Sequence, residues 1–413
     1  MRVLMSAYAC EPDKGSEPGV GWHWAKQAAR FHEVWVLTRA NNRPAIEAEL
    51  ERHPDPNLHF IYVDLPRWLA FWKRGPRGLY LYYYLWQIAA YCRAREGHRE
   101  IGFDLAHHVT FGNNWLPTFL PLLPVPFVWG PIGGAETVPK AFRKDFAFKW
   151  RAYEALRDFI QDWVLGFDPV TRLARKKAKA VLARTQIMAD KLGKSDDSRI
   201  EVIIETGANP HHFELMLNRG KRNDEKFKVV MTGRLLHLKG FHLGIRAFHR
   251  LAKKLPHVTL DIIGAGPEQD RLEGLCKELE LGKKVNFTGW LSQEETFSRM
   301  SQADVFLHPS LKDAGAWVLF EVLELGLPVI CLDYAGPAEI IDDTCGIKII
   351  AGTPDQVIQD LAEAMEMLAT NNDLRERLRA GTRKRVRDLA WDKKGEFLKD
   401  IYEACYLQSR HKS

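Results

Sequence analysis

The residues best suited to bind an anion are two cations, Arg234 and Lys239, in the segment GRLLHLKG. The segment follows a short apolar run, and Gly233 and Gly240 at its ends let the backbone come close to a ligand. Arginine can bridge two phosphate oxygens and lysine supplies a mobile point charge, so the pair suits a diphosphate. The alternative is two solvated charges on a loop, the usual environment of Lys and Arg.

Two acids, Asp313 and Glu321, lie in the segment HPSLKDAGAWVLFEVLELGLP. Within a helix their spacing corresponds to about 12 Å, too far for the closely placed carboxyl pair of glycosidases. They could instead hold two ends of one ligand. We expect a helix to begin near residues 314–316, so that the free N–H groups of residues 316–318 bind phosphates. The alternative is an N-cap aspartate and a glutamate at the edge of the core.

In the first half of the chain, polar or glycine-rich segments also follow apolar runs. We interpret GSEPGVG, residues 15–21, as a loop whose N–H groups can approach an anion. It is neither a P-loop nor a G-x-G-x-x-G motif, so ATP hydrolysis and dinucleotide binding lose support. His107 and His108 end one run and WGPIGG, residues 129–134, ends another. The histidines are either hydrogen-bonded structural residues or groups facing a ligand.

Several function classes are excluded by composition and motif. The sequence has no H-E-x-x-H, Cys/His cluster or G-x-S-x-G, and no D-x-D beside an apolar run, so we expect no metal and no cofactor. The net charge of +6 over 413 residues is too small to indicate nucleic-acid binding. The six cysteines form no C-x-x-C pair, which suits a reducing cytosol and predicts a cytoplasmic protein.

Alternating strands and helices must position these segments. Short apolar runs separated by helical stretches indicate parallel sheets covered on both faces. The expected strands are 2–9, 33–38, 59–65, 103–109, 127–129, 180–183, 201–204, 228–231, 259–263, 285–287, 305–307, 328–332 and 347–350, with a first helix over 22–31. The pattern breaks at the charged segment KRNDEKFK, residues 221–228, and restarts.

We therefore predict an α/β protein with two doubly wound, Rossmann-like domains, residues 1–210 and 211–391. A last amphipathic helix, about 392–413, should dock back on the first domain. Ligands of such folds bind at the carboxyl ends of the strands, so we expect a crevice there between facing domains.

Two aromatic and basic stretches, residues 66–95 and 140–165, allow two interpretations. Their apolar runs are shorter than the roughly 20 residues that span a membrane. Each is either a core helix with basic ends or a segment at a lipid–water interface.

Together these segments resemble the retaining GT-B glycosyltransferases of the group-1, or family four, type. VVMTGRLLHLKGFHLGIRAF is similar to that family's phosphate-binding Arg/Lys segment, and IIGAGPEQDRLEGLCKELEL with VNFTGWL to its GxGP and F-x-G runs. DAGAWVLFEVLELGLPVICLDYAGPAEII resembles its acid-x7-acid motif, and CEPDKGSEPGVGW and VWGPIGGAE match a subgroup. Members of the family build lipopolysaccharide, exopolysaccharide and glycolipids from nucleotide-activated sugars.

The resemblance implies roles for individual residues. Arg234 and Lys239 would neutralise the β-phosphate of the departing nucleoside diphosphate, in place of a metal ion. Glu321 would accept the ribose hydroxyls, and Asp313, where the family usually has Glu, would hold the donor sugar. Either His107 or His108 would point at the transferring sugar. Further donor contacts are implied for Gly15, Ser16, Gly233, Gly266, Ala316, Trp317 and Val318, and acceptor-side contacts for Glu17, Gly133 and Gly134.

The implied reaction moves a sugar from a UDP- or GDP-sugar to a glycan or lipid-linked acceptor with retention of configuration. The protein would act in the cytoplasm, with the inner membrane face as a peripheral contact. A nucleotide-sugar epimerase of the same fold, an NAD-dependent dehydrogenase suggested by GAG at 264–266, and a non-catalytic sugar-binding scaffold are the alternatives. The sequence does not specify the donor base, the donor sugar, the acceptor or the oligomeric state.

Overall fold

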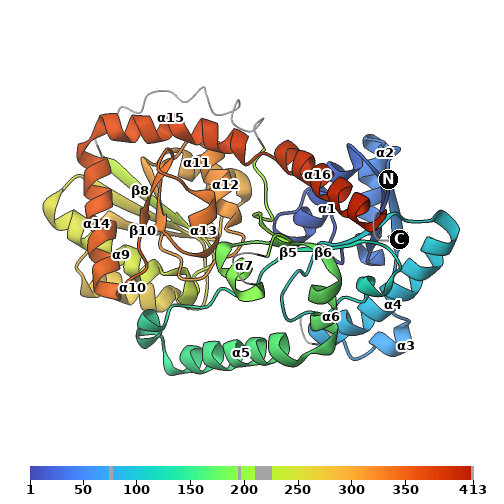
Figure 1. Ribbon diagram of the computed structural model, residues 1–413. Helices are drawn as coiled ribbons and strands as arrows, with labels where there is room; N and C mark the ends of the chain where they lie inside the picture. The colour runs from blue at the N-terminus through green and yellow to red at the C-terminus, as the bar shows by residue number, and fades with distance from the viewer. Residues whose placement is uncertain (74–77, 194–196, 210–225, 411–413) are drawn as a thin grey trace. The chain divides into compact units, whose positions relative to one another are not determined.

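The computed structural model describes residues 1–73, 78–193, 197–209 and 226–410, and the chain divides into two compact units (Figure 1). Unit 1 comprises Met1–Ala135, Arg157–Thr206 and Trp391–Ser413. Unit 2 comprises Glu136–Leu156 and Gly207–Ala390. Each unit has its own parallel sheet and its own hydrophobic core.

Unit 1 is built on a parallel sheet that has seven strands among the described residues, in the order β3-β2-β1-β4-β5-β6-β7. Its strands are β1 (Arg2–Ser6), β2 (Glu33–Thr38), β3 (Leu58–Tyr62), β4 (Leu105–His108), β5 (Phe127–Ile132), β6 (Ala178–Ala183) and β7 (Ile200–Val202). Its helices are α1 (Ser16–Ala29), α2 (Arg43–Arg52), α3 (Arg67–Ala70), α4 (Leu79–Ile101), α6 (Pro169–Lys177), α7 (Gln186–Leu192) and α16 (Trp391–Arg410). The central strands are continuous apolar runs because helices cover both faces of the sheet.

Unit 2 has a parallel sheet with six described strands in the order β10-β9-β8-β11-β12-β13. The strands are β8 (Phe227–Thr232), β9 (Val258–Ile263), β10 (Val285–Gly289), β11 (Val305–His308), β12 (Val329–Leu332) and β13 (Gly346–Ile349). The helices are α9 (Phe241–Lys254), α10 (Gln269–Glu278), α11 (Gln293–Ser301), α12 (Trp317–Glu324), α13 (Ala335–Ile340), α14 (Pro354–Thr370) and α15 (Asn372–Asp388). In both units the first strand pairs with the second and the fourth, as in a doubly wound Rossmann-like sheet.

The predicted α/β class and each predicted strand are confirmed, with strand ends shifted by a few residues. The predicted start of the first helix is wrong, because α1 begins at Ser16 and most of the segment 15–21 is helical rather than a loop. Gly21 shows the physical reason. A Cβ there would lie 2.1 Å from the carbonyl oxygen of Ala9, so glycine lets α1 pack directly against the chain that leaves β1.

Residues 136–156 belong to unit 2, whereas the prediction placed them in the first domain. The short 3₁₀ helix Lys140–Asp145 and the start of α5 (Phe148–Phe167) carry this segment. Val138, Phe142 and Phe146 are almost fully buried within the core cluster of unit 2. Their apolar side chains therefore attach the segment to unit 2, although it comes before that unit's sheet in the chain.

The last helix, α16, belongs to unit 1 and packs on α1. Lys394 donates a hydrogen bond to the Ile204 carbonyl oxygen at 2.6 Å, and the ring of Trp391 stacks on His23. The predicted boundary at residues 210 and 211 and the end of the predicted helix at 411–413 lie outside the described residues. No helix among the described residues is both long and apolar enough to span a membrane.

Candidate functional site

The predicted cation segment lies where β8 ends in unit 2. Gly233 has a φ of 146° and follows the last residue of β8, and Arg234 next to it is exposed. A 3₁₀ turn, His237–Lys239, then leads to Gly240, whose φ is 68°. A Cβ at Gly240 would lie 1.9 Å from the Pro309 carbonyl oxygen, so this glycine lets the segment lie directly against the chain that leaves β11.

Lys239 and Asp313 form a salt bridge through Nζ and Oδ2. The second carboxylate oxygen of Asp313 accepts a hydrogen bond from the Ala316 N–H at 3.0 Å. His308, at the end of β11, places Nε2 3.4 Å from Asp313 Oδ2. Burial opposes ionisation of Asp313, but Lys239 and then His308 outweigh it and hold the pKa of this carboxyl well below its usual range. The structure thus brings two predicted residues together as an ionised pair.

Helix α12 begins four residues after Asp313, close to the predicted start. Ala316 has a φ of 39°, a left-handed conformation, and its N–H is already bonded to Asp313. Of the three predicted phosphate-binding N–H groups, those of Trp317 and Val318 belong to the first turn of α12, where helical N–H groups have no partner within the helix. The N-terminus of α12 therefore presents two donors beside the Lys239–Asp313 pair.

Glu321 lies in the second turn of α12 and is partly exposed. Burial, and to a smaller extent the neighbouring Glu324, raises its pKa to about 7. Glu324 is buried and accepts a hydrogen bond from the Asn209 N–H at 2.6 Å. Glu321 is therefore a carboxyl that titrates near neutral pH next to a fixed acid.

The predicted Gly266 lies in the loop after β9 and packs against residues 233–240, the segment that carries Arg234 and Lys239. A Cβ at Gly266 would lie 2.4 Å from the Leu235 carbonyl oxygen, and one at Gly264 would lie 2.1 Å from the Gly233 carbonyl oxygen. The backbone N–H of Leu235 donates to Ala265 O at 3.0 Å. The two loops are thus packed backbone to backbone, which holds Arg234 at the end of the sheet.

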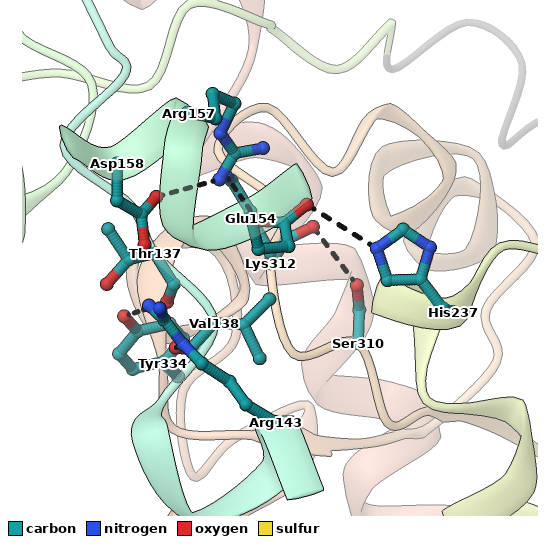
Figure 2. Close-up of polar contacts among 10 residues, drawn as sticks. All are labelled: Thr137, Val138, Arg143, Glu154, Arg157, Asp158, His237, Ser310, Lys312 and Tyr334. Atoms are coloured by element: carbon teal, nitrogen blue, oxygen red, sulfur yellow. Dashed lines mark hydrogen bonds and ion pairs between the residues drawn. The ribbon is translucent and has the colours of Figure 1, made fainter. Parts of the chain in front are cut away.

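A buried carboxylate that sequence reasoning missed, Glu154 on α5, contacts both loops of this site. Its side chain is 0% exposed, with Oε1 at 3.4 Å from His237 Nε2 and Oε2 at 3.4 Å from Lys312 Nζ. Figure 2 draws Glu154 beside these residues, with a dashed line to His237. His237 also stacks on Trp150, with ring centres 4.4 Å apart. His237 precedes Lys239 by two residues and Lys312 precedes Asp313, so Glu154 lies behind both members of the ion pair.

Residues 136–156, which include Glu154, contact the rest of unit 2 at a second point. Tyr334 donates a hydrogen bond from its hydroxyl to the Thr137 carbonyl oxygen at 2.6 Å (Figure 2). Within the segment, Arg143 Nε donates to Val138 O at 2.9 Å. No motif in the sequence pointed to Glu154. In the sequence nothing distinguishes it from other charged residues of α5 such as Lys149 and Arg151, which are exposed.

In unit 1 the predicted residues near the N-terminus of α1 form a separate group. Gly15 is the N-cap of α1, and Ser16 has a φ of 59°. Glu17 accepts a hydrogen bond from the Phe111 N–H at 3.0 Å and forms an ion pair with Arg184 at 3.1 Å. Arg184 also pairs with Glu205 at 2.8 Å. Glu17 therefore joins α1 to the ends of β4 and β6 within unit 1.

His107 and His108 are both buried inside unit 1, which lowers the pKa of each to about 3. Both ring nitrogens of His107 have partners at 2.6 Å, the Tyr402 hydroxyl and the Gly130 carbonyl oxygen. His107 thus joins β4 to α16 and β5. His108 Nε2 lies 3.3 Å from the Tyr83 hydroxyl, and its Nδ1 has no hydrogen-bond partner among the described residues. Of the two, His108 is the one with a nitrogen available.

Gly133 and Gly134 follow β5 and are held against neighbouring chain segments. Gly133 donates to the Gly112 carbonyl oxygen at 2.7 Å, and Gly134 has a φ of 101°. A Cβ at Gly134 would lie 2.8 Å from Asn114 Oδ1. Across the described residues no group of three or more His, Cys, Asp and Glu side chains gathers as a metal site.

Comparison with known proteins gives a family. Residues 213–385 match the family described as "Glycosyl transferases group 1". The chain is 30% identical over 277 residues to the lipopolysaccharide core biosynthesis glycosyltransferase LpsD of Rhizobium meliloti, a match covering 60% of this chain and 78% of LpsD. It is 32% identical over 151 residues to LpsE of the same organism, covering 36% of this chain and 42% of LpsE.

Other curated relatives are likewise matched over only part of their length, about 42% in the case of an archaeal glycosyltransferase. Among solved structures, HepE from Anabaena in complex with UDP has a TM-score of 0.60 and 16% identity, with 98% of this chain and 99% of HepE covered. That likeness confirms the predicted GT-B fold.

Proposed function

Because this chain belongs to the glycosyl transferases group 1 family, we propose that it transfers a sugar from a nucleoside-diphosphate sugar to a glycan or lipid-linked acceptor. The observation that carries the proposal is the cluster in unit 2, where Lys239 and Asp313 form an ion pair beside the N-terminus of α12. Arg234 lies in the same segment as Lys239, and Glu321 lies in α12 itself. Two cations, free helical N–H groups and two separated carboxyls match the parts of a sugar nucleotide.

Each group has a distinct part in the proposed reaction. Arg234 and Lys239 neutralise the charge that develops on the departing diphosphate, so the reaction needs no metal ion. Glu321, when ionised, accepts hydrogen bonds from the ribose hydroxyls. Lys239 and His308 hold the pKa of Asp313 well below its usual range, and in the proposed reaction the ionised Asp313 accepts from a hydroxyl of the donor sugar.

The proposed stereochemical course is retention. The donor's own phosphate oxygen takes the acceptor proton as the acceptor hydroxyl attacks from the same face. The protein then needs to position both substrates and stabilise the leaving group. The first choice of donor is a UDP-sugar, because HepE of the same fold binds UDP, with a GDP-sugar second. The relatives that act on lipopolysaccharide support an acceptor at the cytoplasmic membrane face, with a peripheral membrane contact.

The first experiment is thermal unfolding with EDTA present, against UDP, GDP, CDP, ADP and NAD. At a hundred times its Kd a ligand adds about 2.7 kcal/mol to stability. We expect one nucleoside diphosphate to raise the unfolding temperature and NAD to leave it unchanged. Lys239→Ala and Glu321→Ala should abolish the shift, while Lys253→Ala, an exposed lysine on α9, should retain it.

Transfer itself is measured with the matching sugar nucleotide and an acceptor panel, and the anomeric configuration of the product is read by NMR. A product of inverted configuration would contradict the proposed course. Conversion of the sugar nucleotide to its epimer without acceptor would show that the protein is an epimerase and not a transferase. A shift with NAD alone would refute the nucleotide-sugar proposal.

A further inference from the structure

Among the described side chains of helix α5, some polar residues are buried and several large apolar residues are exposed. In the part of α5 that belongs to unit 1, Gln161 is 7% exposed. With its amide oriented to satisfy both neighbours, it accepts from Trp115 Nε1 at 3.0 Å and donates to the Gly134 carbonyl oxygen at 3.1 Å. Phe159 and Trp163, one turn apart, are 68% and 58% exposed. Amphipathic helices of globular proteins usually bury their apolar side chains. We therefore expect the exposed apolar side chains of α5 to contact a partner.

A second exposed apolar group of unit 1 lies on α3 and the start of α4. Trp68, Phe71 and Tyr80 are each more than half exposed. The ring of Tyr80 contacts Trp115 edge-on, with centres 4.8 Å apart, so Trp115 touches α4 as well as α5. We call the combined set the aromatic surface, and its members are Trp68, Phe71, Tyr80, Leu81, Phe159, Ile160, Trp163 and Phe167. Monomeric proteins rarely expose many large apolar side chains near one another without a function.

Helix α6 adds positive charge beside the aromatic surface. Its sequence PVTRLARKK contains four cations and no acid, and all four, Arg172, Arg175, Lys176 and Lys177, are exposed. The guanidinium of Arg172 lies 5.9 Å from the ring centre of Phe167 at the end of α5. On its other side, Lys177 donates to the Pro121 carbonyl oxygen at 3.0 Å. Figure 1 shows α6 directly following α5 in the chain.

The combination of aromatic and basic side chains selects one kind of partner. Tryptophan, tyrosine and phenylalanine favour the headgroup level of a bilayer, and nearby Lys and Arg are attracted to anionic lipid. A second copy of the chain fits less well, because a two-fold contact would bring the cations of α6 close to their own copies.

We propose that the aromatic surface and the cations of α6 dock this protein on the interfacial region of a bilayer containing anionic lipid. The aromatic side chains enter the headgroup region, and α6 contacts the lipid phosphates and other anionic groups. The inference extends the proposed lipid-side acceptor, but its test measures lipid binding alone. It can therefore fail while the transfer reaction stands, and the reverse also holds.

The experiment is flotation of the full chain with two kinds of vesicle, phosphatidylcholine alone and phosphatidylcholine with 30% phosphatidylglycerol as the probe. We expect binding to be about tenfold tighter to the anionic vesicles, a difference of about 1.4 kcal/mol. Phe159→Ser/Trp163→Ser should abolish binding to both. Arg172→Glu/Lys176→Glu should remove the preference for anionic lipid.

Two matched variants serve as controls. Trp290→Ser removes an aromatic side chain that is 79% exposed in unit 2, and Lys253→Glu/Lys384→Glu reverses two exposed cations of unit 2. Both should bind vesicles as the unaltered chain does. Circular dichroism and the nucleotide-dependent thermal shift establish that each variant is folded.

Three results would overturn the proposal. One is absence of flotation of the unaltered chain with either vesicle. A second is equal loss of binding in the control variants. The third is a dimer in sedimentation equilibrium that Phe159→Ser/Trp163→Ser dissociates, which would assign the aromatic surface to a second copy.

Discussion

Glu321 is a carboxyl whose charge state should respond to pH in the working range. Burial and Glu324 raise its pKa to about 7, above its ordinary value, so folding favours the protonated form. Its contribution to stability is therefore complete at acid pH and is lost as the pH rises through 7. Replacement by Gln removes this loss.

We predict that Glu321→Gln and the unaltered chain unfold with nearly equal free energy at pH 4, below the ordinary pKa of a glutamate. At pH 8.5 the variant should be more stable by about 1–2 kcal/mol, since each unit of pKa shift corresponds to about 1.4 kcal/mol and partial exposure reduces the full value. Urea unfolding at both pH values measures this. As a control, Glu366→Gln on the surface of α14 should show no such pH dependence. Equal stabilities at pH 8.5 would contradict the raised pKa.

Individual residues differ in how far the sequence could place them. Arg234, Lys239 and Asp313 were predictable because each follows a buried strand, and the carboxyl ends of parallel strands meet at one edge of a sheet. The hydrogen bonds of His107 to α16 and β5 were not predictable, because its partners are remote in the chain. Glu154 was missed for the same reason, since its contacts with His237 and Lys312 depend on the packing of α5.

At the scale of elements, the start of α5 acts in unit 2 as a brace behind two loops. Glu154 is fully buried and lies beside His237 and Lys312. Removing its carboxylate therefore takes away the hydrogen-bonding and charged partner of these two side chains. We predict that Glu154→Ala lowers the free energy of unfolding of unit 2 by about 3 kcal/mol, as expected when a buried ion pair loses one member. We also expect nucleotide affinity to fall about tenfold, because both loops carry proposed ligand contacts.

Chemical unfolding and calorimetric titration with nucleotide measure the two effects. Glu154→Gln keeps hydrogen-bonding capacity and should restore most of the affinity. Glu366→Ala, which breaks the exposed pair with Lys254, should cost less than about 1 kcal/mol and leave affinity unchanged. If Glu154→Ala destabilised unit 2 with no change in affinity, its role would be structural alone.

Elements were predictable where a single local signal defines them. Strands such as β2 and β8 were found from their apolar runs. The start of α1 was missed because its glycines read as a loop, whereas Gly21 is needed for close packing against Ala9. The attachment of residues 136–156 to unit 2 depends on which core receives Phe142 and Phe146, and no local pattern specifies that.

For the whole molecule, the two separate cores predict two unfolding transitions. Each transition can be assigned to its unit by a substitution that leaves a cavity in that unit's core. Leu4 of unit 1 and Leu361 of unit 2 are both 0% exposed, and replacing a buried leucine by alanine costs about 2–5 kcal/mol. We expect Leu4→Ala to lower the temperature of one calorimetric peak and Leu361→Ala to lower the temperature of the other.

Nucleotide should then raise the temperature of only the peak that Leu361→Ala affects, because Arg234, Lys239 and Glu321 all belong to unit 2. At a hundred times Kd the gain is about 2.7 kcal/mol, and Lys239→Ala should remove it without moving the other peak. Differential scanning calorimetry with and without UDP decides the matter. If UDP raised both peaks, the nucleotide would also be held by unit 1, where Gly15 and Ser16 are the predicted contacts. A shift confined to the peak lowered by Leu4→Ala would contradict the donor assignment altogether, since neither Arg234 nor Lys239 lies in unit 1.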